Sequence, residues 1–179
     1  MGREQLMTLG KIVLVLVIAV ILQTLLVSRV RVLGVTADLF LIMTVIVAMN
    51  RGSMEGALFG FFAGLVADTV FFQPLGVHAL IFVLTGYFVG MFVARFGTLT
   101  PWAVLALVGT CSFLSQLVFG VIQYVMGPRA AFFTVVGTQM IPEAVLDALV
   151  AVPVCMLLVR LGLIPAPSVE PGTGRNVPE

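Results

Sequence analysis

The sequence predicts an all-α integral membrane protein, built as a bundle of six transmembrane helices. Of its 179 residues, 61% are hydrophobic and only 9% are charged, whereas soluble domains are roughly half apolar and about one-quarter charged. Six apolar runs follow one another along the chain. Most of these runs are close in length to the spanning helix that a hydrocarbon core of about 30 Å requires, which has about 20 residues. Together these two observations exclude a soluble fold.

The apolar runs belong to one membrane domain, residues 1–161. The first run ends in "VSRVRV" without a small-x-small cleavage site, which indicates a retained helix and not a signal peptide. The second run is short. The later breaks, "NRG", "FFQPLG", "RFGTLTP" and "MGPRAAFFTVVG", carry residues typical of turns and loops. The six predicted helices cover residues 9–28, 36–50, 53–71, 77–95, 101–125 and 139–161.

The distribution of Lys and Arg predicts that both termini lie in the cytoplasm. An even number of spans places both termini on one side, and cytoplasmic loops carry an excess of basic residues. The side of the termini would hold Arg3, Lys11, Arg51, Arg95, Arg160 and Arg175, and the external side would hold Arg29, Arg31 and Arg129. Residues 162–179 are rich in Pro and Gly, so we expect a disordered cytoplasmic tail.

Glycines in the third predicted helix indicate close packing against another helix. They recur at every fourth position, at Gly52, Gly56, Gly60 and Gly64, and therefore share one helix face. In membranes, small residues let two helix backbones approach closely. Such a row serves packing inside the bundle, which is the commoner use, or receives the helix of a partner protein. The candidates for partner docking are Gly56, Gly60, Gly64, Gly86 and Gly90.

In the predicted topology, polar residues gather toward the external side of the membrane. Carboxylates in this zone are costly to bury and are functional candidates by default. Helix ends that reach water are the alternative explanation. The set, a candidate for recognition of a ligand or a partner, comprises Asp38, Asp68, His78, Arg129, Glu143 and Asp147.

Asp68 also has a structural interpretation. It lies one turn before "FFQPLG", where its carboxylate can accept hydrogen bonds from N–H groups at the start of the fourth helix. The helix dipole favours an anion at that place. His78 lies near the same helix start and is the candidate hydrogen-bond partner. As the only histidine, with no cysteine beside it, His78 is a poor candidate for a metal site.

Glu143 and Asp147 lie four residues apart and share one face of the sixth helix. Two like charges at this spacing repel, so we expect either a counter-charge, with Arg129 as the candidate, or a protonated carboxyl. No nucleophile, metal-ligand set or glycine-rich phosphate loop accompanies the pair. We therefore predict no catalytic residue, no metal and no cofactor. The net charge of +1 gives no reason to expect a nucleic acid partner.

The run "GALFGFFAGLVADTVFFQPLGVHALIFVLTGYFVG", residues 56–90, resembles the central signature of the MreD family of bacterial rod-shape-determining proteins. In that signature a glycine-rich helix ends in Asp, a "PLG" turn follows, and a glycine-containing helix comes next. "GVTADLFLI" and "IPEAVLDALVAVP" extend the resemblance over residues 34–161. Two positions depart from the family pattern: Ala37 stands where Pro is common, and Asp147 stands where a neutral residue such as Asn is expected.

The resemblance implies a non-catalytic inner-membrane subunit of the machinery that builds the lateral cell wall as rod-shaped cells elongate. It implies direct binding to the membrane-anchored MreC. Because the two adjacent glycine rows offer more close-approach surface than one neighbouring helix can cover, we predict that the transmembrane helix of MreC docks on part of them. It also implies that the protein works with the MreB filament, the RodA glycosyltransferase and a class B penicillin-binding transpeptidase in a larger assembly, and that membrane lipids surround the protein.

The same resemblance implies a fold similar to the S-components of energy-coupling-factor vitamin transporters. A small-molecule-binding S-component is therefore the alternative function. Those proteins typically use an Ala-x-x-x-Ala motif in the first helix to meet the coupling subunit. The first predicted helix here has a single alanine, Ala19, which counts against transport.

Overall fold

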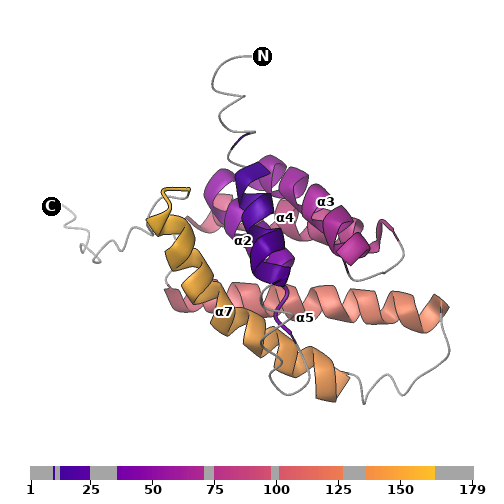
Figure 1. Cartoon of the computed structure of the whole chain (residues 1–179). Helices are drawn as coiled ribbons and strands as arrows, with labels where there is room; N and C mark the ends of the chain where they lie inside the picture. Colours follow the sequence, from indigo (N-terminus) through magenta and orange to yellow (C-terminus); the bar gives the residue numbers. More distant parts are fainter. Residues whose placement is uncertain are drawn as a thin grey trace, which may run out of the picture.

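The structure, a computed structural model, describes residues 10, 13–24, 36–70, 75–97, 101–126 and 136–163. The described residues form helices with short connections and contain no strand, so the predicted all-α class is confirmed (Figure 1). The helices are Val13–Thr24, α2 (Leu39–Arg51), α3 (Ser53–Val70), α4 (Val77–Phe96), α5 (Pro101–Met126) and α7 (Ile141–Arg160), and a π-helical segment, η1 (Val136–Met140), leads into α7.

Four of the described helices are long and apolar enough to cross a membrane. These are α3, α4, α7 and the stretch Trp102–Ile122 of α5, as expected for an integral membrane protein. The helix Val13–Thr24 and α2 are apolar but shorter. The sequence predicts longer helices there, at 9–28 and 36–50, and part of the first range lies outside the described residues.

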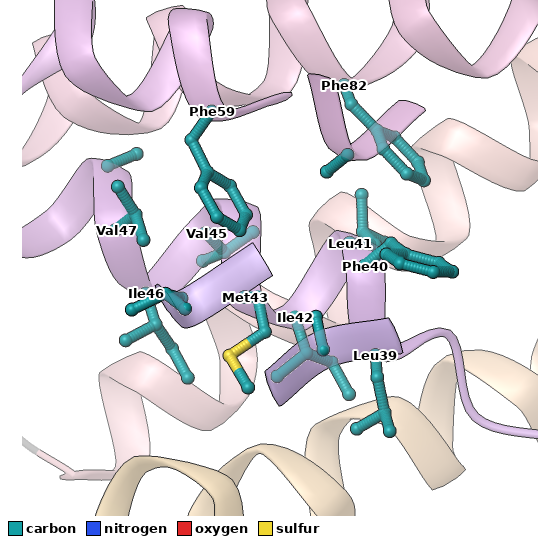
Figure 2. Packing of buried hydrophobic residues seen from close by; sticks show 14 of the residues in the cluster. Leu39, Phe40, Leu41, Ile42, Met43, Val45, Ile46, Val47, Phe59 and Phe82 are labelled. Atoms are coloured by element: carbon teal, nitrogen blue, oxygen red, sulfur yellow. The ribbon is translucent and has the colours of Figure 1, made fainter. Parts of the chain in front are cut away.

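α2 is the central helix of the fold. Every residue from Leu39 to Ala48 is buried, because α2 contacts α3, α4, α5 and α7. Phe59 of α3 and Phe82 of α4 are also buried, and both side chains point toward α2 (Figure 2). Figures 1 and 2 place α3 and α4 on one side of α2 and α7 on the other. A helix that is apolar all round is typical of such a central position.

α3 and α4 share the most extensive helix–helix contact in the described part of the chain. Their glycines face each other so closely that a Cβ atom on Gly60 would overlap the carbonyl group of Phe82. A Cβ atom on Gly64 would overlap the backbone of Ala79, and one on Gly86 would overlap the carbonyl group of Gly56. The two backbones are therefore in direct contact, as small residues allow in membrane helices.

The five glycines proposed from the sequence as partner-docking candidates all lie inside the bundle. All are buried, and a Cβ atom on any of them would overlap atoms of α2, α3, α4 or the α2–α3 junction. No free face is left at these positions for the helix of a partner. The docking hypothesis is therefore corrected here, since the glycines serve the internal packing that is their commoner use. The residues concerned are Gly56, Gly60, Gly64, Gly86 and Gly90.

α5 and α7 form a second helix pair. Near their crossing, a Cβ atom added to Gly109 of α5 would lie 3.4 Å from the Cβ atom of Ala148 on α7, which is an ordinary contact. α5 meets α4 and α2 over a smaller area. The fold therefore consists of two helix pairs, α3–α4 and α5–α7, with α2 between them.

Candidate functional site

The polar residues expected to form one external set fall into two groups in the structure. Asp68 and His78 lie together at the junction of α3 and α4. Asp38, at the start of α2, lies beside Asp147 in the second turn of α7. Arg129 lies outside the described residues, so the structure does not describe the expected counter-charge.

Asp68 caps the start of α4. One carboxylate oxygen, Oδ2, accepts the N–H of Gly76 at 2.7 Å, and the other, Oδ1, accepts the N–H of His78 at 3.1 Å. Gly76 is the N-cap residue of α4 and has a φ of 99°, which favours glycine. Asp68 itself is 1% exposed. The capping interaction expected from the sequence is confirmed.

The His78 side chain completes this junction. Its Nδ1 atom lies 2.7 Å from Oδ1 of Asp68. The imidazole ring lies against Phe119 of α5, with ring centroids 4.6 Å apart, and against Phe82 of α4 at 5.6 Å. The expected hydrogen bond between Asp68 and His78 is confirmed, and the ring contact extends the junction to α5.

The second group is built around the start of α2. Asp38 is the N-cap residue, and its Oδ1 accepts the N–H groups of Phe40 at 3.0 Å and Leu41 at 3.1 Å. This is the usual way in which an Asp side chain satisfies the free donors of a helix start. The N–H of Asp38 donates to Oδ1 of Asp147 on α7, at 2.8 Å. Residues 109 positions apart in the chain are thus joined directly.

Asp147 is fully buried and holds two partners. Besides the N–H of Asp38, its carboxylate accepts the hydroxyl group of Ser112 on α5 through Oδ2. Ser112 in turn accepts a hydrogen bond from the amide of Gln116, at 3.3 Å. Glu143 is half-buried and lies one turn before Asp147 on α7. In the described part of the chain, every buried side-chain nitrogen or oxygen has a hydrogen-bond partner.

Two members of this second group, Gln23 and Ser112, are absent from the set predicted from the sequence. Gln23 is 1% exposed. Its Oε1 accepts the N–H of Leu39 at 2.9 Å, and its Nε2 donates to the carbonyl of Ala37 at 3.2 Å. A glutamine inside an apolar run is the signal that points to Gln23. For Ser112, the signal is the spacing of Ser112, Ser115 and Gln116 on one face of α5.

Chemically, both groups tie helix ends together. In the first, a carboxylate binds backbone N–H groups and an imidazole. In the second, carboxylates bind backbone N–H groups and a hydroxyl. Among the described residues, no three His, Cys, Asp or Glu side chains form a group that could hold a metal ion. The contacts described at both groups are those of structural junctions.

Comparison with known protein families matches residues 4–162 to the family described as rod shape-determining protein MreD. The match covers most of the 179 residues. No curated protein and no solved structure gave a match.

Proposed function

Because the chain belongs to the family of the rod shape-determining protein MreD, we propose that it is a non-catalytic subunit of the machinery that builds the lateral cell wall. The family match over residues 4–162 is the observation that carries this proposal. It assigns the chain a role in rod-shape determination. In the proposed role, the chain binds MreC and helps to organise or regulate RodA and a class B penicillin-binding protein alongside MreB.

The nature of the buried polar groups supports a non-catalytic role. Asp68, His78, Asp38 and Asp147 each hold a helix end or a neighbouring helix. A carboxylate engaged with two backbone or hydroxyl donors is well placed for positioning. A general acid or base has to exchange its proton with a substrate within hydrogen-bond reach.

We place the protein in the inner membrane with both termini in the cytoplasm. Arg51, Arg95 and Arg160 occupy the last turns of α2, α4 and α7. The end of α4 lies beside the start of α3, since Gly90 packs against Ser53, and the second turn of α7 lies beside the start of α2, since Asp147 binds Asp38. Arg51 and Arg95 therefore share one end of the fold, and basic residues favour the cytoplasmic side.

MreC binding requires a surface other than the two glycine rows, because those rows are occupied inside the bundle. The outward faces of the helices carry large apolar side chains, among them Leu58 and Phe61 on α3 and Leu114 and Val118 on α5. These faces meet lipid or a partner's transmembrane helix. Membrane helices associate through packing and hydrogen bonds, not through a hydrophobic force.

The experiment is complementation in a rod-shaped bacterium that lacks its own MreD protein. We expect this chain to restore rods, and we expect MreC to copurify with it from native membranes. Round cells despite normal membrane levels of the chain, together with no recovery of MreC, would contradict the proposal. A bound small molecule in the purified chain, identified by mass spectrometry, would instead favour the transporter S-component. Ala19 is fully buried, so it offers no outward contact to a coupling subunit.

A further inference from the structure

The two helix pairs differ in how they are held together. α3 and α4 touch backbone to backbone along their glycines, so their relative position is fixed by close packing. α5 and α7 pack through side chains and share the hydrogen bond between Ser112 and Asp147. Each pair therefore has internal contacts that do not involve the other pair. The orientation of one pair relative to the other must depend on contacts made across α2 and between α4 and α5.

Asp147 links the second pair to the start of α2. One carboxylate oxygen holds Ser112 within its own pair, and the other accepts the N–H of Asp38, which begins α2. A hydrogen bond of 2.8 Å is directional. Apolar contacts between membrane helices are not directional, and no hydrophobic force drives them together. The Asp38–Asp147 bond therefore constrains the angle between α7 and α2 more strongly than an apolar contact of the same size.

The start of α2 is also bound by the helix Val13–Thr24. Gln23 of the helix Val13–Thr24 binds both the N–H of Leu39 and the carbonyl of Ala37. α2 in turn contacts both α3 and α4, and its residues Leu39 to Ala48 are all buried. A constraint placed on the first residue of α2 is therefore transmitted to the α3–α4 pair.

We propose that Asp147 is a positioning residue that acts as a latch between the two helix pairs. While Asp147 accepts the N–H of Asp38, the α5–α7 pair is held in one orientation relative to α2, α3 and α4. When that bond is lost, the two pairs shift relative to each other, and each pair stays intact. The latch is a property of this chain alone and does not depend on any partner.

Two cysteine pairs in the full-length chain, in native membranes, report on the two kinds of contact. Thr85 of α4 and Ser115 of α5 have hydroxyl oxygens 3.3 Å apart, so Thr85→Cys with Ser115→Cys reports on contact between the pairs. Gly109→Cys with Ala148→Cys reports on contact within the α5–α7 pair, where the Cβ atoms would lie 3.4 Å apart. The native Cys111 and Cys155 are first replaced by Ala.

Oxidative cross-linking is then compared in Asp147→Ala and Asp147→Asn. We expect Asp147→Ala to slow cross-linking between the pairs severalfold. Cross-linking within the α5–α7 pair should slow by a smaller factor, because that pair loses the Ser112 bond but keeps its side-chain packing. Asp147→Asn should restore the between-pair rate, because the amide oxygen still accepts the N–H of Asp38 and the amide N–H₂ donates to Ser112. Unchanged rates at both positions in Asp147→Ala would overturn the proposal. Equal slowing at both positions would also overturn it, since Asp147 would then act no more strongly between the pairs than within its own pair.

A second comparison removes the donor and leaves Asp147 in place. Asp38→Pro and Asp38→Ala both lose the capping side chain, but only Asp38→Pro lacks the backbone N–H. The φ of −90° at Asp38 lies near the range of proline. We expect between-pair cross-linking to be slower in Asp38→Pro than in Asp38→Ala. Equal rates in the two variants would contradict the latch even if Asp147→Ala fails to accumulate.

Discussion

The carboxylate of Asp68 binds His78 twice, through the backbone N–H at 3.1 Å and through Nδ1 of the ring at 2.7 Å. The same carboxylate also binds the N–H of Gly76. One buried side chain at the end of α3 therefore fixes where α4 begins and how the imidazole is turned. Because the imidazole contacts Phe119, the position of α5 depends on this junction as well.

Replacing Asp68 separates its hydrogen-bonding role from its charge. Asp68→Ala leaves the N–H groups of Gly76 and His78 without their acceptor, which costs about 1–3 kcal/mol for each buried donor left unsatisfied. We expect a clear loss of stability against denaturant in detergent micelles, and disturbed assembly and cell shape. Asp68→Asn retains one acceptor oxygen and should lose less. Full tolerance of Asp68→Ala in both measurements would contradict a role for Asp68 in structure or in partner recognition.

Gln23 gives a second test, at the start of α2. Gln23→Leu preserves volume but removes both hydrogen bonds to α2, and we expect a loss of about 1–2 kcal/mol in a membrane setting. The amide of Leu39 should also exchange its hydrogen faster. The matched control is Thr24→Val on the same helix, since the exposed Thr24 hydroxyl bonds only back to the carbonyl of Val20 in the described contacts. Equal stability of the two variants would show that Gln23 does not anchor α2.

The orientation in the membrane can be tested by reporter fusions at residue 179 and in the loop at Arg129. We expect the C-terminal fusion in the cytoplasm and the fusion at Arg129 outside, because Arg51, Arg95 and Arg160 occupy the last turns of α2, α4 and α7, and basic residues favour the cytoplasmic side. A C-terminal fusion that reports from outside would reverse the topology. The ends of the helices that carry Asp38 and Asp68 would then face the cytoplasm.

What could be predicted from the sequence depended on distance along the chain. The Asp68–His78 contact joins residues only ten positions apart, so adjacency in sequence was enough to propose it. The Asp38–Asp147 contact joins residues 109 positions apart, and helix periodicity says which residues share a face without saying which helix lies opposite. For the same reason Gln23 and Ser112 were missed, although each is a polar residue in an apolar run.

The start of α7 also differs from what the sequence predicts. Pro142 lies in the opening turn of α7, and the π-helical segment η1 just before it was not predicted from the sequence. Proline lacks an N–H, and its ring pushes away the carbonyl four residues earlier, so a wider turn relieves the crowding. Composition and the lengths of the apolar runs were sufficient for the all-α membrane class, because in lipid a spanning helix satisfies all of its own backbone hydrogen bonds.

Regularly spaced glycines can serve either packing inside the bundle or docking of a partner's helix, and the structure shows packing inside the bundle. Gly60→Ala places a methyl group on the carbonyl group of Phe82, and Gly86→Ala places one on the carbonyl group of Gly56. Overpacking of this kind costs about 1–3 kcal/mol, so we expect lower amounts of the protein in membranes and a lower resistance to denaturant. MreC should copurify in proportion to the protein that remains, since the added methyl groups lie inside the bundle.

Gly10→Ala is the control, because a Cβ atom at Gly10 meets nothing within 4 Å. Loss of MreC at unchanged protein levels in Gly60→Ala or Gly86→Ala would return the docking surface to the glycine rows.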